Sequence, residues 1–150
     1  MDTIVVGVDG SGGSRAALMW AYGEAQRRKA VVRAVSAWQY PYIALAPAPM
    51  GGAIAPAASM QAASEEALAS VLADVEAPAS VQVERVVKEG SGARVLLAES
   101  ADAVLLVVGA RGHDGFTGLL VGSVATQCLH HARVPTVVVP TTQNAEANVA

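Results

Sequence analysis

The sequence contains little cysteine and little charge. Its 150 residues include a single cysteine, Cys128, which excludes an internal disulfide framework and favours a reducing, cytoplasmic location. Charged residues make up only 15% of the chain, and the formal net charge is −3. Because nucleic acids and anionic membrane surfaces are bound through basic patches, we expect neither as a partner.

Long apolar runs are also absent, although hydrophobic residues make up 53% of the chain. The longest apolar stretches are too short, and too interrupted by glycine and proline, to supply the roughly 20 residues of a membrane-spanning helix. Met1 and Asp2 lead straight into a predicted strand, so we expect no secretory leader. The length suits one domain with a buried core, which we place at 1–140, followed by a disordered tail at 141–150.

Apolar, β-branched runs alternate along the chain with segments of helical periodicity. Ser14 is the predicted N-cap of the first helix, and Pro78 is the predicted end of the second. Five strands alternating with four helices predict an α/β fold, a doubly wound parallel sheet with helices on both faces. The predicted strands are 3–8, 31–38, 81–87, 103–108 and 134–139, and the helices are 14–29, 59–77, 93–100 and a last one from about Ser123.

The least regular region is 39–58, where four prolines and two glycines forbid a long regular element. A loop of this length is either functional or mobile. Its apolar content fits a lid or packing flap about as well as a solvated linker.

A glycine-rich segment follows the predicted buried strand 103–108 and ends where a helix begins. Gly109, Gly112 and Gly122 permit positive φ and carry no Cβ, so backbone N–H groups can approach an anion closely. The first turn of the next helix adds unpaired N–H groups, and Ser123 adds a hydroxyl. The segment therefore predicts a phosphate site, although it contains neither a Walker A motif nor Gly-x-Gly-x-x-Gly.

The spacing of Gly, two residues, Gly, nine residues and Gly-Ser resembles the nucleotide motif of the universal stress protein family. Gly109, Gly112, Gly122 and Ser123 satisfy it without a gap, and the resemblance extends over about 2–140. Other landmarks occur in the same order: Val-Gly-Val-Asp-Gly-Ser at 6–11, Ser14, Ala-Val at 34–35 and Val-Pro-Thr-Val-Val-Val at 134–139.

The resemblance implies the strand order 3-2-1-4-5, which brings the ends of strands one and four together at the topological switch point. It implies that Asp9 accepts hydrogen bonds from ribose hydroxyls, whereas the position before Gly10 taken alone favours a turn-forming Asp. It also implies that the backbone of Val35 meets the adenine edge, whereas the plain alternative for this valine is the core.

The phosphates are expected along the glycine-rich segment. The resemblance places Val108 and Gly109 beside the ribose, with Arg111 either supplying charge to the outer phosphates or lying solvated in the loop. The remaining residues expected at the phosphates, all through backbone amides, are Gly112, Gly122, Ser123 and Val124.

These features predict a stress-response or regulatory protein that binds ATP, with or without Mg²⁺, and has little or no turnover. Alternatives are a sensor of cyclic AMP or AMP and a slow ATPase that uses Arg111, His113 or Asp114. No cluster has the spacing of a metal site, so Mg²⁺ is expected to arrive with the nucleotide and to be held by phosphates and water. Cys128 is expected to be a small buried hydrophobe.

The last predicted strand suggests a partner. A valine-rich strand at 134–139 would expose an unpaired edge in a monomer, and pairing with a second copy would cover it. We therefore expect a homodimer through Val134 to Val139, the alternative being that the tail covers this edge.

Overall fold

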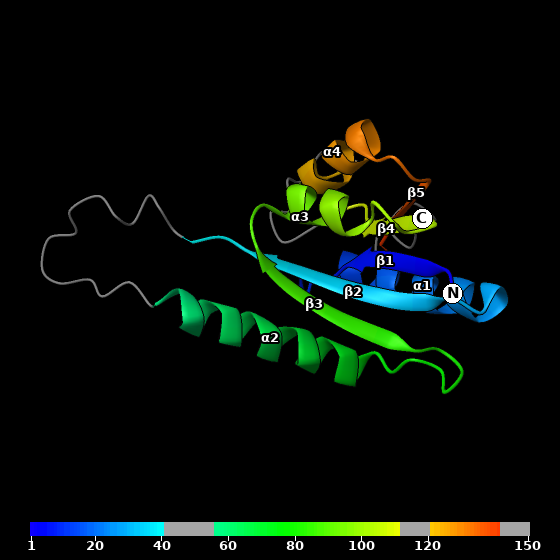
Figure 1. The fold of residues 1–150 in the computed structure, drawn as a ribbon, viewed down its shortest axis with the longest axis horizontal. Coiled ribbons are helices and arrows are strands. Elements are labelled where there is room, and N and C mark those ends of the chain that lie inside the picture. Colours follow the sequence, from blue (N-terminus) through cyan, green and yellow to red (C-terminus); the bar gives the residue numbers. More distant parts are fainter. Residues whose placement is uncertain (41–55, 112–120, 142–150) are drawn as a thin grey trace, which may run out of the picture.

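The computed structural model describes residues 1–40, 56–111 and 121–141, which form a five-stranded parallel sheet flanked by helices (Figure 1). The strand order is β3-β2-β1-β4-β5, so the predicted doubly wound α/β fold and its order 3-2-1-4-5 are confirmed. The strands are β1 (Thr3–Gly7), β2 (Val31–Trp38), β3 (Val83–Glu89), β4 (Leu105–Gly109) and β5 (Thr136–Val139). The helices are α1 (Gly12–Arg28), α2 (Ala57–Asp74), α3 (Gly92–Glu99) and α4 (Ser123–His131).

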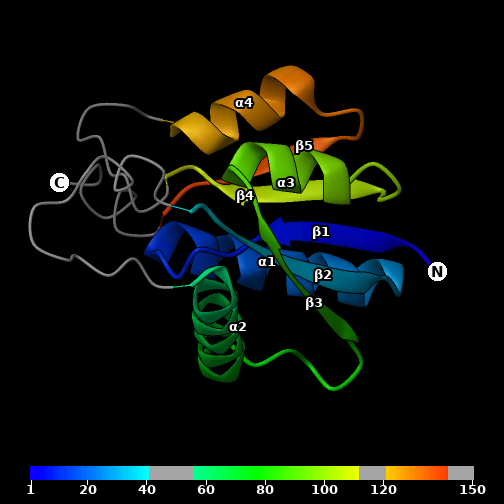
Figure 2. The ribbon, with the colours of Figure 1, turned by 60° about the vertical axis from the view of Figure 1, so that its left-hand side comes forward.

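The helices cover both faces of the sheet, α1 and α2 on one side and α3 and α4 on the other (Figures 1 and 2). Two apolar clusters fill the layers. One includes Ile4 and Val107 with residues of α1 and α2, and the other includes Val5 and Leu106 with residues of α3 and α4. Alternate residues of the central strands therefore serve opposite cores, as expected for strands buried on both faces.

The first helix begins earlier than its predicted cap. Ser11, rather than Ser14, is the N-cap, and its hydroxyl accepts a hydrogen bond from the Ser14 N–H. Ser14 lies in the first turn, where its own hydroxyl donates back to the Ser11 carbonyl at 3.1 Å. The prediction chose the wrong serine because both are good caps and the two intervening glycines gave no helical signal.

The second helix ends earlier than predicted. Its last residue is Asp74, followed by the C-cap Val75, so Pro78 lies in the connection to β3 and does not end the helix. In the sheet that the structure describes, β3 pairs with β2 and forms one edge, as the predicted strand order implies. Within the described residues, no helix is long and apolar enough to cross a membrane.

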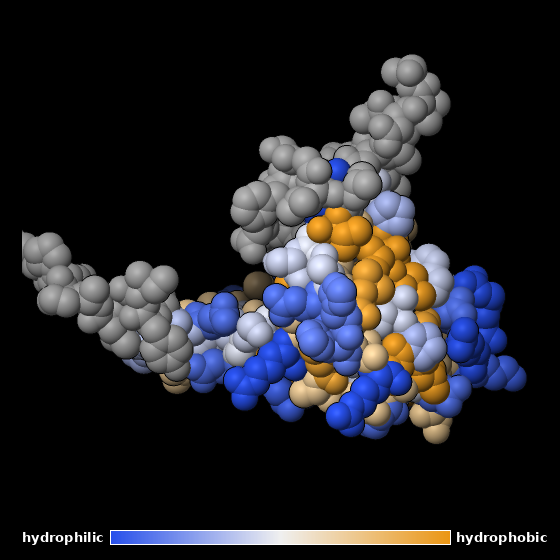
Figure 3. All heavy atoms as spheres, turned by 90° about the horizontal axis from the view of Figure 1, so that it is seen from above, coloured by the Kyte–Doolittle hydropathy of each residue, from blue (hydrophilic) through white to orange (hydrophobic). Residues whose placement is uncertain are grey.

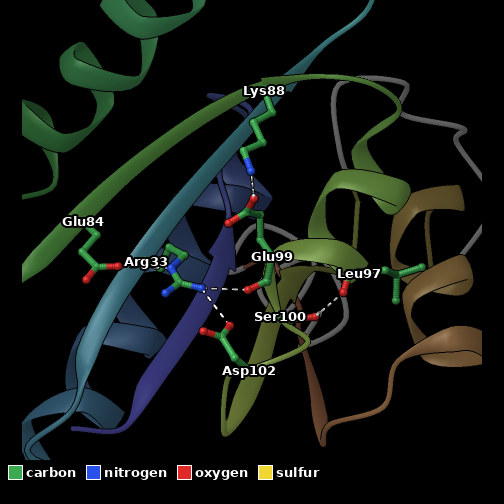
Figure 4. Close-up of polar contacts among 7 residues, drawn as sticks. All are labelled: Arg33, Glu84, Lys88, Leu97, Glu99, Ser100 and Asp102. Atoms are coloured by element: carbon green, nitrogen blue, oxygen red, sulfur yellow. Dashed lines mark hydrogen bonds and ion pairs between the residues drawn. The ribbon is translucent and has the colours of Figure 1, made fainter.

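A group of ion pairs fastens α3 to the sheet (Figure 4). The Arg33 guanidinium of β2 contacts Glu84 at 3.1 Å and Asp102 at 3.0 Å, and it donates to the Glu99 carbonyl at 2.9 Å. Lys88 pairs with Glu99 at 2.5 Å. One arginine therefore joins β2 to β3 and to the carboxyl end of α3, where carbonyls lack helical partners.

Candidate functional site

The carboxyl ends of β1 and β4 lie side by side at the point where the strand order reverses. Asp9 follows the end of β1, and Gly109 is the last residue of β4. Ligands of open α/β sheets bind outside the carboxyl ends of strands at such a switch point. The crevice predicted from the sequence therefore has its two principal strands in place.

Two glycines meet where the start of α1 crosses the end of β4. A Cβ added to Gly109 would lie 2.6 Å from the Gly13 carbonyl oxygen, and one added to Gly13 would lie 2.3 Å from the Arg111 carbonyl oxygen. Real Cβ atoms do not approach backbone this closely, so both positions require glycine. Sequence reasoning missed Gly13, and its only signal was a second glycine before Ser14.

The small size of these glycines matters more than their φ. Gly10 and Gly90 are the described glycines with positive φ, at 84° and 143°. Gly122 has φ −72° and ψ 172°, an extended conformation that any residue can adopt. Gly109 and Gly122 therefore do not adopt the positive φ that glycine permits, and Gly109 is needed for the close contact with Gly13.

Asp9 is exposed and takes part in a compact hydrogen-bonded turn. Its Oδ1 accepts from the Ser11 N–H at 2.9 Å and from the Ser11 hydroxyl at 2.5 Å. Its own N–H donates to the Ser14 hydroxyl at 3.3 Å. The turn-forming role is thus observed, and the exposed carboxylate lies just beyond the carboxyl end of β1.

Val35 and Val108 are buried, with 2% and 3% of their surface exposed. The Val35 carbonyl accepts a hydrogen bond from the Val8 N–H at 2.8 Å, whereas the Trp38 carbonyl accepts from the Gly90 N–H on the β3 side. Backbone groups of alternate residues in a strand bond to opposite neighbours. Ala37 therefore turns its N–H and C=O toward the space beyond the end of β1, a position that sequence reasoning did not identify.

The end of β2 is fixed to α2 by one glutamine. Trp38 Nε1 donates to the Gln61 side-chain oxygen at 2.5 Å, and Gln61 Nε2 donates to the Val87 carbonyl at 3.1 Å. Gln61 therefore joins the end of β2, β3 and the first part of α2.

The glycine-rich segment returns to β4 before α4 starts. The Gly122 N–H donates to the Ala110 carbonyl at 2.5 Å, so this amide is already engaged. The first helical bond of α4 runs from the Thr126 N–H to the Gly122 carbonyl. Ser123 and Val124, both exposed, therefore present first-turn N–H groups that have no partner inside the helix.

Arg111 lies between these features. Its carbonyl packs against Gly13, and its Nε is buried with no hydrogen-bond partner among the described residues. A buried guanidinium nitrogen without an acceptor is costly, which does not fit a simply solvated side chain. An anion beside Arg111 would supply the missing acceptor.

Several predicted residues fall outside the described part of the chain. Gly112, His113 and Asp114 lie in 112–120, most of the 39–58 loop lies in 41–55, and the tail lies in 142–150. Across the described ranges, no group of three or more His, Cys, Asp and Glu side chains is arranged to hold a metal ion. Cys128 is fully buried as predicted, and burial raises the pKa of its thiol to about 11.

Comparisons with known proteins agree on the family. The model of the universal stress protein family matches residues 1–140. Universal stress protein Rv2005c of Mycobacterium tuberculosis is 40% identical over 136 residues, which cover 90% of this chain and 44% of the relative. The chain therefore spans less than half the length of this relative.

Solved structures show the same fold. Universal stress protein UspA from Lactobacillus plantarum has a TM-score of 0.73 and 22% identity, with 92% of this chain and 97% of that chain covered. A universal stress protein solved in complex with cAMP has a TM-score of 0.60 and 23% identity, with 94% and 98% covered. Given the family match and the identity to the mycobacterial relative, the chain belongs to the universal stress protein family.

Proposed function

We propose that this protein binds an adenine nucleotide in the crevice between β1 and β4, with ATP as the ligand, and that it acts in regulation or stress response. The observation that carries the proposal is the buried, unpartnered Nε of Arg111. It lies on the segment between the end of β4 and the first turn of α4, whose amides at Ser123 and Val124 have no helical partners. Charge and oriented N–H groups together suit phosphates.

The sugar and base would extend from the phosphates toward β1 and β2. Asp9 offers carboxylate acceptors to ribose hydroxyls, and its turn leaves it exposed at the mouth of the crevice. The Val35 carbonyl is already engaged by the Val8 N–H, so the base edge would meet the backbone of Ala37, which faces the same side beyond the end of β1. Mg²⁺ would be held by the phosphates and water rather than by a protein cluster.

Little or no hydrolysis is proposed. Phosphoryl transfer needs a positioned metal and a group that orients the attacking water. The described crevice offers Asp9 as its carboxylate, and Ser11 already holds that side chain in a turn. Replacing His113 and Asp114 together should therefore leave any residual phosphate release unchanged, and a large fall in rate would favour a slow ATPase.

Cyclic AMP is the second candidate ligand, because a structural neighbour was solved in complex with cAMP. The base and ribose contacts proposed above would serve either nucleotide. Calorimetric titration with ATP and Mg²⁺, followed by displacement with cyclic AMP, separates the two. ATP binding that cyclic AMP does not displace supports the first proposal, and a preference for cyclic AMP supports a sensor of that nucleotide.

Two aspartates at opposite ends of β1 provide the test of the site. Asp9→Asn should weaken ATP binding about tenfold or more, because a charged acceptor of ribose hydroxyls is lost. Asp2→Asn makes the same change before the strand, away from the crevice, and should leave the affinity unchanged. Equal effects of the two substitutions in calorimetry would contradict the assignment.

We also propose that two copies pair through β5. This strand is a sheet edge, and its four residues are only partly buried. The neighbouring α4 leaves Val124 and Leu129 exposed, at 38% and 52%. Apolar side chains gather among hydrophilic ones on the face of the molecule that Figure 3 shows. A second copy would cover both the edge and this face.

A further inference from the structure

The hydroxyl of Ser11 serves two partners at once. It accepts a hydrogen bond from the Ser14 N–H at 3.2 Å, which caps α1, and it donates to Asp9 Oδ1 at 2.5 Å. The Ser11 N–H donates to the same oxygen at 2.9 Å. Two donors from one residue therefore fix the orientation of the Asp9 carboxylate.

The buried hydroxyl of Ser14 adds two more hydrogen bonds to this network. Only 4% of its surface is exposed, and its hydroxyl accepts from the Asp9 N–H while donating to the Ser11 carbonyl. Gly13, which lies between the two serines, packs against the Arg111 carbonyl. The network that holds Asp9 is thus in contact, through Gly13, with the segment that leads from β4 to the proposed phosphate site.

From this geometry we propose that Ser11 is a positioning residue for Asp9 and makes the site select ribonucleotides over 2′-deoxyribonucleotides. The inference rests on the proposed function. In this proposal the carboxylate that Ser11 holds is the acceptor of a ribose hydroxyl. A carboxylate held in one orientation loses less rotamer freedom on binding, so less of the binding free energy of the ribose contact is lost to ordering the side chain.

The chain contains its own control for helix capping. Asp9-Gly10-Ser11-Gly12 leads into α1, and Glu89-Gly90-Ser91-Gly92 leads into α3, in the same order of acid, glycine, serine and glycine. Ser91 is the N-cap of α3 and accepts from the Arg94 N–H at 3.3 Å. Removing either hydroxyl costs a helix cap, but only Ser11 orients the carboxylate at the end of β1.

The experiment measures the dissociation constants of ATP and 2′-deoxy-ATP by calorimetry for the full chain and its variants. The wild type should prefer ATP. Ser11→Ala should reduce this preference roughly three- to tenfold, the range of one hydrogen bond, while the affinity for 2′-deoxy-ATP stays the same. Ser11→Thr keeps the hydroxyl and should keep the preference, and so should Ser91→Ala.

The outcomes separate the two proposals. If Ser11→Ala weakens both nucleotides equally, Ser11 acts through the helix alone and the inference is overturned. The inference also fails if the wild type binds both nucleotides equally, or if Asp9→Ala removes the preference while Ser11→Ala retains it. Binding of neither nucleotide by the wild type would overturn the proposed function itself.

Discussion

Neighbouring glycines at the start of α1 have opposite surroundings. An added Cβ at Gly12 would meet nothing within 4 Å, whereas one at Gly13 would overlap the Arg111 carbonyl. Neither has a positive φ, so alanine is compatible with the backbone at both sites. Comparing alanine at the two positions therefore measures the free energy cost of the steric overlap at Gly13, separately from any cost of changing the backbone conformation.

Gly13→Ala should lower the free energy of unfolding by about 1–3 kcal/mol, because α1 must shift away from the end of β4. Gly12→Ala should be neutral or stabilising by up to about 1 kcal/mol, since alanine favours a helix. Denaturant titrations of the two variants give the comparison. Equal stabilities would mean that the contact between α1 and the segment after β4 is loose.

This glycine shows where sequence reasoning stopped. The motif Gly109 to Ser123 could be found because its spacing is contained in one segment. The requirement at Gly13 arises only when α1 crosses β4, and nothing local to Gly13 encodes that crossing. The network of Asp9, Ser11 and Ser14 was likewise hidden, because two serines close together compete for the same cap.

At the scale of elements, the attachment of α3 depends on Arg33 and carboxylates that face it. The Asp102 carboxylate is exposed, and its hydrogen bond to the Arg33 guanidinium holds the pKa of Asp102 below its usual value. A carboxyl group whose pKa is lower in the folded state stabilises the fold when it is ionised. This contribution is present above the unfolded pKa of about 3.9 and is lost as the pH falls through the folded value.

Asp102→Asn should therefore lower stability slightly at pH 7, as expected for an exposed pair. The difference from wild type should shrink as the pH falls from about 5 to about 3, because the wild-type carboxylate is then protonated. Thermal unfolding at several pH values measures it. In an Arg33→Met background the substitution should have no such pH dependence, and a persistent dependence would identify a different partner.

The elements themselves followed from the sequence more closely than their ends did. The span of β2 was predicted as observed, because an apolar run between two clear breaks defines it. The second helix ended before Pro78, since the structure closes it at Val75 and leaves the proline in an open connection. Helix ends depend on local hydrogen bonds that composition does not specify.

At the scale of the whole molecule, the backbone groups of β5 point to two sides, one toward β4 and one toward the open edge of the sheet. The Pro135 carbonyl accepts from the Leu106 N–H of β4, and the Val139 carbonyl accepts from the N–H of Ala110, which follows β4. Odd-numbered residues of β5 therefore bond within the sheet, and Val138 directs its backbone groups to the open edge. A proline can distinguish these positions, since it removes one N–H.

Val138→Pro should weaken the proposed dimer about tenfold or more and leave the fold intact, because the lost N–H faces outward. Val137→Pro removes an N–H that faces β4 and should unfold the sheet at this edge. Sedimentation over a range of concentrations, with circular dichroism of both variants, tests this. A Val138→Pro variant that remains dimeric would contradict pairing through β5, as would a wild type that is monomeric at micromolar concentration.

The two edges of the sheet differ in chemistry, which sets a limit on assembly. The β3 edge carries charged side chains of both signs, whereas β5 is a threonine followed by three valines. Charges on an edge strand oppose its pairing with another chain. If copies join through β5 alone, each copy has one edge that can pair. The assembly is then a closed dimer and cannot grow into a fibre.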